Sequence, residues 1–358
     1  MTSSSPFQNM FSLPENFPQA QCIALKRELL IFGKVNCYSY HTRGNQYRWV
    51  CKLPRDYPNC GYCVVNLPKT NGEKETTLWM FGGYNGEVKM MKYVSVWKKK
   101  TNVQKLSQVS NANGQEVCIN RGQNNFRSMR AVIGGRNNNL LFITYSKSID
   151  VFNINTYTYV ATSLLPVVDT LLHHCFVLKT TKHSTTAAAA GRLQKKANVE
   201  MLLFCKKTGL SINYDEDRKK FDIAYVHICS SMRMLHYYAF VCANGMVLFF
   251  GGVRESPPDS ADVYKYVIEE DKWVKCEQAL PYPLTNCTAV VSGDHEHVHI
   301  IGSSLGSVHL RTKLKDWMRR DTKAEKLWIV EEEDFREIEK VNCEINDMQQ
   351  NANINNLK

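Results

Sequence analysis

The stretch at residues 239–252, which reads AFVCANGMVLFFGG, decides the fold. It opens with a small residue and an apolar run, turns at Asn244-Gly245, and continues through a second apolar run to the pair Gly251-Gly252. Short runs of β-branched and aromatic residues on both sides of a turn indicate two antiparallel strands. Glycine suits a strand end that needs a positive φ, or a place where another backbone passes too closely for a side chain.

The same phrase occurs six times along the chain, and a small residue opens every copy. Internal repetition at this scale is typical of solenoids and propellers, and the strand composition excludes helical repeats. Unbroken apolar runs indicate strands that are covered on both faces, as in packed blades. We therefore expect the small residues to surround a narrow central axis. They are Cys22, Cys63, Ala131, Cys175, Ala239 and Ala289.

A third and a fourth strand follow in each unit, and spaced aromatic residues mark them. Phe152 to Tyr159, Tyr214 to Phe221 and Tyr266 to Trp273 are each seven residues apart, and Gly82-Gly83 repeats the glycine pair of residues 251–252. With these features the chain resembles the kelch-repeat family over about residues 7 to 318. The resemblance implies four-stranded blades in a β-propeller, the superfamily to which galactose oxidase-like propellers belong.

The sixth unit supplies three strands, and the start of the chain supplies the missing one. Residues 7–14 end in Leu13-Pro14, just as Leu53-Pro54 ends the first unit. A closed ring has no open sheet edge, so we predict that the N-terminal segment closes the last blade. The alternative is that the segment around Trp317, which follows the third strand of the sixth unit, completes this blade instead. The predicted fold class is all-β: a six-bladed kelch-type β-propeller over residues 1–320.

The second blade departs most from the pattern. Its fourth strand is expected near residues 103–106, and an Asn- and Gln-rich linker at residues 107–127 leads to the third blade. Polar insertions at residues 66–77 and 179–200 are expected between the first and second strands of their blades. Extra residues are tolerated there because such loops lie outside the packed sheets.

Beyond residue 320 the composition changes, and residues 321–358 form a second unit. Apolar residues recur there at near-helical spacing among acidic ones, which predicts a short amphipathic helix outside the ring, followed by a disordered Asn-rich tail. The helix either packs against the propeller or provides a docking or self-association surface. The apolar residues are Trp328, Ile329, Phe335, Ile338, Val341 and Ile345.

Charge divides between these two units. The chain has 45 Lys and Arg against 34 Asp and Glu, and residues 321–358 hold five and ten of these, so the remaining ring has a net charge of +16. A basic ring could attract nucleic acid, an anionic surface or acidic proteins. Its basic residues are scattered through different loops instead of alternating with aromatic residues on one face. This pattern disfavours nucleic acid as the partner and favours an acidic protein.

Composition also indicates the compartment. No segment approaches the roughly 20 consecutive apolar residues that span a bilayer, so we predict no membrane insertion and a cytoplasmic location. The thirteen cysteines are odd in number, and several lie at the repeated inner-strand positions. We expect them to be buried free thiols.

Chemical motifs are few. His295-Glu296-His297-Val298-His299 resembles a metal site, because alternate residues of a strand share a face. It falls at an expected hairpin turn, however, and a metal needs further ligands, so we assign no metal and no cofactor. Either residue of His173-His174 could approach the channel. A copper oxidase of the galactose oxidase type is the enzymatic alternative, but no Tyr, Cys and His set matches that family's motif, so we assign no catalytic residue.

The kelch resemblance implies a binding face built from two sets of loops, those joining the fourth strand to the next blade and those joining the second strand to the third. We therefore predict a non-enzymatic scaffold that binds a partner protein or peptide, with cytoskeletal proteins among the candidates. Arg and Tyr dominate binding energy at protein interfaces. The predicted partner-binding residues are Arg55, Tyr57, Tyr84, Arg254 and Tyr282.

Overall fold

The computed structural model describes residues 5–54, 62–69, 75–82, 86–98, 104–119, 128–179, 198–254, 258–304 and 306–356. Four residues singled out in the sequence lie outside this part of the chain, namely Arg55, Tyr57, Gly83 and Tyr84. Residues 70–74 and 180–197 of the two predicted insertions lie outside it as well.

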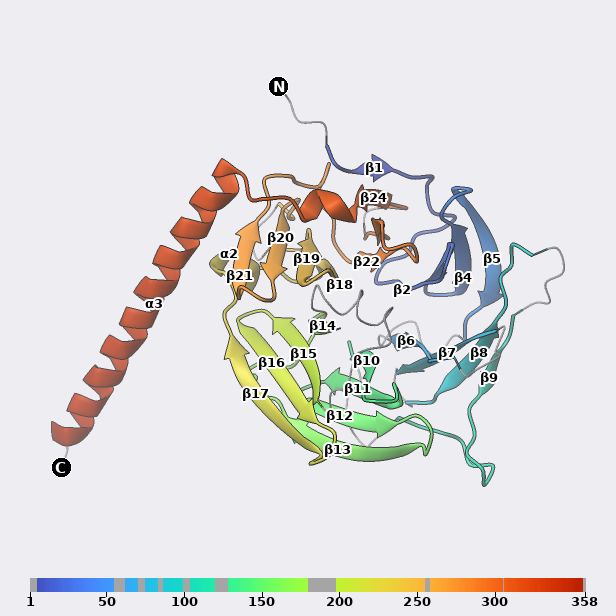
Figure 1. The fold of residues 1–358 in the computed structure, drawn as a ribbon, viewed down its shortest axis with the longest axis horizontal. Helices are drawn as coiled ribbons and strands as arrows, with labels where there is room; N and C mark the ends of the chain where they lie inside the picture. The colour runs from blue at the N-terminus through green and yellow to red at the C-terminus, as the bar shows by residue number, and fades with distance from the viewer. Residues whose placement is uncertain are drawn as a thin grey trace.

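Six four-stranded antiparallel sheets stand radially around a central axis (Figure 1). Each inner strand adjoins the inner strands of both neighbouring blades, so the ring is continuous. The predicted six-bladed propeller is confirmed.

Blade 1 contains β2 (Gln21–Ala24), β3 (Glu28–Phe32), β4 (Asn36–His41) and β5 (Gln46–Lys52), and blade 2 contains β6 (Tyr62–Asn66), β7 (Thr76–Gly82), β8 (Lys89–Tyr93) and β9 (Leu106–Gln108). Blade 3 contains β10 (Arg130–Gly134), β11 (Leu140–Tyr145), β12 (Ser148–Asn153) and β13 (Thr158–Leu164), and blade 4 contains β14 (Cys175–Leu178), β15 (Asn198–Cys205), β16 (Thr208–Asp215) and β17 (Lys220–Val226). Blade 5 contains β18 (Ala239–Ala243), β19 (Met246–Phe250), β20 (Val263–Val267) and β21 (Lys272–Lys275), and blade 6 contains β22 (Thr288–Val291), β23 (His297–Ile301), β24 (His309–Lys313) and β1 (Gln8–Asn9).

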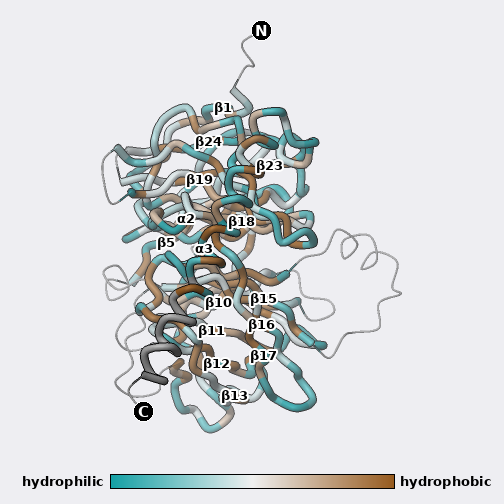
Figure 2. The backbone as a smooth tube through the Cα atoms, turned by 90° about the vertical axis from the view of Figure 1, so that its left-hand side faces the viewer, coloured by the Kyte–Doolittle hydropathy of each residue, from teal (hydrophilic) through white to brown (hydrophobic). Residues whose placement is uncertain are grey.

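The core lies between the faces of neighbouring blades. Phe204 of blade 4 meets Phe249 and Trp273 of blade 5 edge-on, with ring centroids 5.8 and 5.3 Å apart. The seven-residue aromatic spacing corresponds to opposite positions on the third and fourth strands, as for Tyr266 and Trp273, which are paired across β20 and β21. Hydrophobic residues concentrate in the strands and hydrophilic ones in the turns (Figure 2). Neighbouring sheets thus bury both of their faces against each other.

A close approach between blades explains the glycines of residues 251–252. Gly251 has a φ of +65°, and a Cβ there would lie 2.3 Å from the carbonyl oxygen of Leu284, in the loop that leads to blade 6. Gly252 has a φ of +119°. A larger residue would need a strained backbone and would clash with the neighbouring loop.

The N-terminal segment closes the ring, as predicted. Strand β1 pairs antiparallel with β24, and the Met10 N–H extends the ladder by donating to the carbonyl oxygen of His309 over 2.9 Å. The alternative, closure by Trp317, is wrong. The 3₁₀ helix η1 (Leu314–Trp317) begins directly after β24, so the chain turns away from the sheet edge, and Trp317 packs against Phe7 at 5.6 Å.

A buried chain of hydrogen bonds crosses the closing seam between blades 6 and 1. His299 Nδ1 lies 2.8 Å from His309 Nε2, and His309 Nδ1 hydrogen-bonds the Tyr47 hydroxyl. That hydroxyl donates to the carbonyl oxygen of Phe11, 3.1 Å away in the N-terminal segment. Burial, reinforced by Arg311, lowers the pKa of His299 to about 3. Both histidines are therefore neutral at pH 7, and burial also holds the pKa of His309 well below its usual value.

The second blade differs from the sequence prediction in detail. Its fourth strand, β9, begins at Leu106, whereas the strand was expected to end there. The predicted linker is also partly core, because Val109, Val117 and Ile119 are buried between blades 2 and 3. A small hairpin in which Ser110 bridges Glu116 places them there. Isolated apolar residues among many Asn and Gln were too weak a signal for this packing.

The C-terminal helix α3 (Lys323–Asn356) lies outside the ring and packs against β21 (Figures 1 and 2). Thr322 and Glu325 form a capping box at its start: the Glu325 N–H donates to Thr322 Oγ1, and the Thr322 N–H donates to Glu325 Oε2. The helix includes the Asn-rich stretch that was expected to be disordered. Once a helix is nucleated, continuing it through Asn costs only about 0.7 kcal/mol per residue. Within the described ranges, no helix is both long and apolar enough to cross a bilayer.

Candidate partner-binding face

The two sets of loops named in the sequence analysis lie on one face of the ring. In each antiparallel blade, the turn between the second and third strands and the connection to the next inner strand are at the same end. Direct pairing shows this in two blades, where Ser146 bridges Leu171 and Val253 bridges His236. This face surrounds one opening of the central channel, and we refer to that opening as the mouth.

Residues with a left-handed backbone surround the mouth. In five blades the residue two positions before the inner strand has a positive φ of 51° to 58° although it is not glycine, and the matching position of blade 2 lies outside the described residues. Such conformations are uncommon for other residues and persist only where the surrounding structure enforces them. Here the crossover between blades enforces them. The five residues are Gln19, Ser128, His173, Tyr237 and Asn286.

Hydrogen bonds connect part of this ring around the mouth. The Gln19 N–H donates to the carbonyl oxygen of Asn286 over 2.8 Å, and the Asn286 N–H donates to that of Tyr237 over 3.0 Å. The Gln19 amide also donates to Asn286 Oδ1 at 2.9 Å, and the His173 ring stacks on Tyr237 with centroids 3.9 Å apart. The ring therefore presents polar and aromatic side chains in fixed positions.

Two adjoining hollows form the mouth, with volumes of about 180 and 240 Å³. Gln19, Gln21, Arg130 and His173 line both of them. Of the six small inner-strand residues, four line the hollow of about 180 Å³, and two are buried beside it between blades. Those in the lining are Cys22, Cys63, Ala131 and Ala289, and those buried between blades are Cys175 and Ala239.

Arg130 is the charged residue that lines both hollows of the mouth. It is half-buried, its Nε donates to the carbonyl oxygen of His174 over 3.3 Å, and its guanidinium carbon lies 5.8 Å from the centroid of the Phe240 ring. It forms no ion pair with any carboxylate in the part of the chain that the structure describes. An arginine in this position can hold an anionic group, because its guanidinium can form two charge-assisted hydrogen bonds with a carboxylate.

The two neighbouring histidines have different places. His173 lines the mouth, and burial, together with the charges of Arg130 and His236, lowers its pKa to about 4. His174 is fully buried, and its Nε2 lies 2.7 Å from Thr144 Oγ1. Both are uncharged at pH 7, so the positive charge of the mouth comes from Arg130, which lines both hollows, and from Lys34, which lines the one of about 240 Å³.

Two of the five predicted partner-binding residues lie in the described part, and each already has a partner within the molecule. Arg254 follows Val253 on the mouth face, and its guanidinium contacts Asp262 at 2.5 Å. The Tyr282 hydroxyl donates to Asn9 Oδ1 over 3.3 Å, next to the closing strand. The structure brings neither to the mouth lining. A role for all five in binding stays a prediction.

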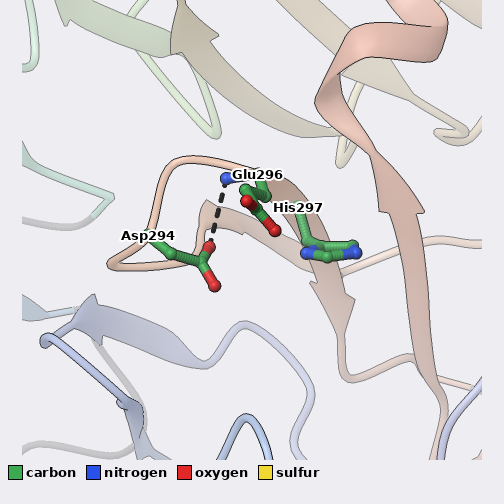
Figure 3. Close-up of side chains that lie close together, drawn as sticks. All are labelled: Asp294, Glu296 and His297. Atoms are coloured by element: carbon green, nitrogen blue, oxygen red, sulfur yellow. Dashed lines mark hydrogen bonds between the residues drawn. The ribbon is translucent and has the colours of Figure 1, made fainter.

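The histidine-rich motif of blade 6 does not form a single cluster. His299 is buried in the seam, His295 is exposed, and the possible ligand atoms of Asp294, Glu296 and His297 lie within 4.8 Å of one another (Figure 3). Asp294 Oδ1 already accepts from the Glu296 N–H and from Ser292. Besides burial, the positive charge of Arg311 lowers the pKa of His297. The same charge opposes a metal cation, and we assign none.

The residue types that a copper radical oxidase would use do meet in one place. Tyr40, Tyr47, His299 and His309 share the closing seam, with Cys22 in the same cluster. His309 uses both ring nitrogens in hydrogen bonds and offers neither to a metal. The cluster connects the N-terminal segment to blades 1 and 6, and we assign no catalytic residue there.

Sequence reasoning missed the left-handed ring and Arg130. Only glycine reliably reveals a positive φ in a sequence, and these positions carry ordinary residues. One signal was present, because each of them lies two or three residues before a small inner-strand residue. The repeat alignment therefore placed them at the channel without showing which side chains would face it.

Comparisons with known proteins support the fold. No protein-family model matches the chain, and no curated protein matches it. A solved structure titled "Structure of YjhT" is similar at 12% sequence identity and a TM-score of 0.52, covering 84% of this chain and 95% of that one. A likeness at this identity shows the propeller fold alone.

Proposed function

We propose that the chain is a non-enzymatic interaction scaffold that binds a partner protein or peptide on the mouth face, in the manner implied by the kelch resemblance. The observation that supports this most is Arg130, a half-buried cation without a carboxylate partner among the described residues, inside a rigid ring of polar side chains. The proposed contact is an Asp or Glu side chain of the partner, inserted into the mouth.

The chemistry of the mouth fits such a group. The Arg130 guanidinium would bind the carboxylate through two parallel hydrogen bonds. Gln19 and Gln21 supply amide groups beside it, and Tyr237 supplies aromatic contact area. The net charge of +16 outside residues 321–358 would accelerate the approach of an acidic partner.

A cytoplasmic location belongs to the same proposal. Apart from Cys242, the described cysteines are free thiols, and most of them are buried, with Cys118 exposed. Burial raises the pKa of Cys63 to about 12, so this thiol stays protonated and unreactive. Unpaired thiols in such numbers suit a reducing compartment.

Affinity enrichment followed by mass spectrometry tests the proposal. Wild-type protein is compared with Arg130→Ala and with Arg218→Ala, an exposed arginine in the turn between β16 and β17 on the opposite face. Both substitutions remove one positive charge. We expect Arg130→Ala to reduce recovery of specific partners at least tenfold, because a buried charge pair contributes several kcal/mol, and we expect Arg218→Ala to change nothing.

Thermal melting of both variants separates binding from folding. Equal recovery of the same partners by all three proteins would contradict the assignment of the mouth. Release of peroxide when copper and sugar alcohols are added would contradict the non-enzymatic part of the proposal.

A further inference from the structure

Helix α3 is docked on the propeller by its polar side. Glu325, Glu332 and Glu339 recur every seven residues and therefore share one face of the helix. Each carboxylate is held by hydrogen bonds. Glu332 accepts from the N–H of Ser230 at 2.8 Å, from its hydroxyl at 2.6 Å, and from His227 Nε2 at 3.4 Å.

The other two carboxylates fix the helix in the same way. Glu325 accepts from the Glu277 N–H at 3.0 Å and from both terminal nitrogens of Arg319 at 2.8 and 2.9 Å. Glu339 binds Arg233 through two hydrogen bonds of 2.5 and 2.7 Å. Burial alone would raise the pKa of Glu332, but the hydrogen bonds from His227 and Ser230 outweigh it and lower that pKa. All three carboxylates are therefore charged at neutral pH. Trp328 adds an aromatic contact to the propeller, because its ring centroid lies 6.2 Å from that of Tyr264.

The opposite face of the same helix is apolar and exposed. At about 100° per residue, the apolar side chains on this face form one band, in which Asp334 lies between Val330 and Ile338. Their exposed fractions lie between 45% and 66%. We call this band the apolar stripe; it consists of Leu327, Val330, Ile338, Val341 and Ile345. Amphipathic helices of globular proteins usually turn their apolar face toward the core. Because α3 is docked by the opposite face, we take this exposed apolar face as an interaction surface.

From Glu331 onward, the residues that border the stripe are mainly acidic. Helical geometry places Glu331, Asp334, Glu337 and Glu344 within about 100° of its centre, and all four are exposed. Arg336 and Lys340 lie beyond that arc, whereas Lys323 and Lys326 lie within it at the start of the helix, beside Leu327 and Val330. A partner that covers Ile338, Val341 and Ile345 would therefore supply positive charge beside apolar side chains.

We propose that the apolar stripe binds a basic amphipathic helix of a second protein, with apolar residues at helical spacing and Lys or Arg beside them. This goes beyond the function proposed for the mouth and uses a separate surface. A second copy of α3 in parallel orientation fits less well, because it would bring Asp334, Glu337 and Glu344 of one copy against the same acidic residues of the other. Antiparallel pairing of two copies is an outcome of the test below. Anionic lipid would likewise be repelled.

Fluorescence anisotropy with the full-length chain tests this inference. The probe is a fluorescein-labelled synthetic three-heptad helix with Leu and Ile in its seam and Lys beside them. A second probe has Glu in place of those Lys residues. We expect the wild-type protein to bind the Lys probe at least tenfold more tightly than the Glu probe, with an affinity that falls as salt rises.

Two variants assign the binding to the stripe. Ile338→Ser with Val341→Ser should weaken the Lys probe at least tenfold. Glu337→Lys with Glu344→Lys should reverse the preference between the probes, which non-specific apolar adhesion would not do. Val168→Ser, at an exposed apolar residue of the loop after β13, is the control and should leave the affinity for the Lys probe unchanged.

Several results would overturn the proposal. These are equal binding of both probes, binding that persists in the Ser variant, or no binding of the Lys probe at micromolar protein. Sedimentation of the protein alone provides the last arm. A dimer that dissociates on Ile338→Ser and Val341→Ser would assign the stripe to self-association instead.

Discussion

The propeller and helix α3 bury opposite kinds of side chain. In the ring, apolar side chains such as Phe204 and Phe249 are buried between blades, and charged groups lie in the turns. In α3, charged Glu332 is buried against the ring, and apolar Ile338 is exposed. The ring is therefore built for its own stability. The helix is held in place by polar contacts that leave its apolar face available.

This contrast separates stability from interaction. Apolar burial accounts for most of the stability of the ring, since each buried large side chain contributes about 2 kcal/mol. The dock of α3 relies on charge-assisted hydrogen bonds, which are specific in direction but smaller in net energy. Perturbations of the ring should be costly, and perturbations of the exposed face of α3 should be almost neutral.

Removal of residues 1–14 should have the largest effect. It deletes β1 and the buried Leu13, takes Phe7 away from Trp317, and leaves β24 as an open edge. We expect a loss on the order of 5 kcal/mol in the free energy of unfolding, measured with urea. Phe11→Ala is the control, because that side chain is 64% exposed and should change stability little. An unchanged urea midpoint for the truncated chain would show that β1 does not hold the ring closed.

Acidification should act on the ring next. His299 and His309 have depressed pKa values in the folded protein, so below pH 6.5 the unfolded chain binds more protons than the folded one. The contribution of these two histidines to the free energy of unfolding is therefore fully present above this pH. It falls as the pH drops, by about 2 kcal/mol per histidine at pH 5. Urea unfolding at pH 7.5 and 5.0 measures the loss.

The variant His309→Gln assigns this effect to the seam. It should remove one histidine's share of the pH dependence, whereas His295→Gln, at an exposed position, should leave the whole of it. The same pH dependence in wild type and His309→Gln would mean that the acid sensitivity comes from elsewhere.

Loss of one docking carboxylate should have an intermediate effect. Glu332→Gln removes the charge that Ser230 and His227 face, and we expect the protein to lose about 1–3 kcal/mol. Hydrogen exchange along α3 should accelerate while the blades stay protected. The neighbouring Glu331→Gln, at an exposed position, provides the comparison. If both variants exchange alike, the polar dock does not hold the helix.

Ile338→Ser should have the smallest effect on folding. The side chain is 59% exposed, so the free energy of unfolding should change by no more than about 0.5 kcal/mol. A loss comparable with that of Glu332→Gln would show that the stripe is packed in the folded chain, and would remove the contrast between the two faces of α3.

Much of the ring could be predicted from residues close together in the sequence. The apolar runs, turns and seven-residue aromatic spacing are local signals, and they indicated the blades and the closing segment. Blade 2 was harder, because Val109, Val117 and Ile119 become core residues only by packing between two blades. The capping box at Thr322 and Glu325 was a visible local signal that the sequence analysis did not use.

The sequence by itself determined a ring of six blades and the strand that closes it, because repetition and strand periodicity are written into neighbouring residues. Only the tertiary structure decided that Arg130 lies without a carboxylate partner in the described part of the molecule, beside a left-handed ring, and that α3 docks by its glutamates. Both depend on groups far away in the chain. An amphipathic pattern shows that a helix has two faces, and the surface opposite decides which of them is buried.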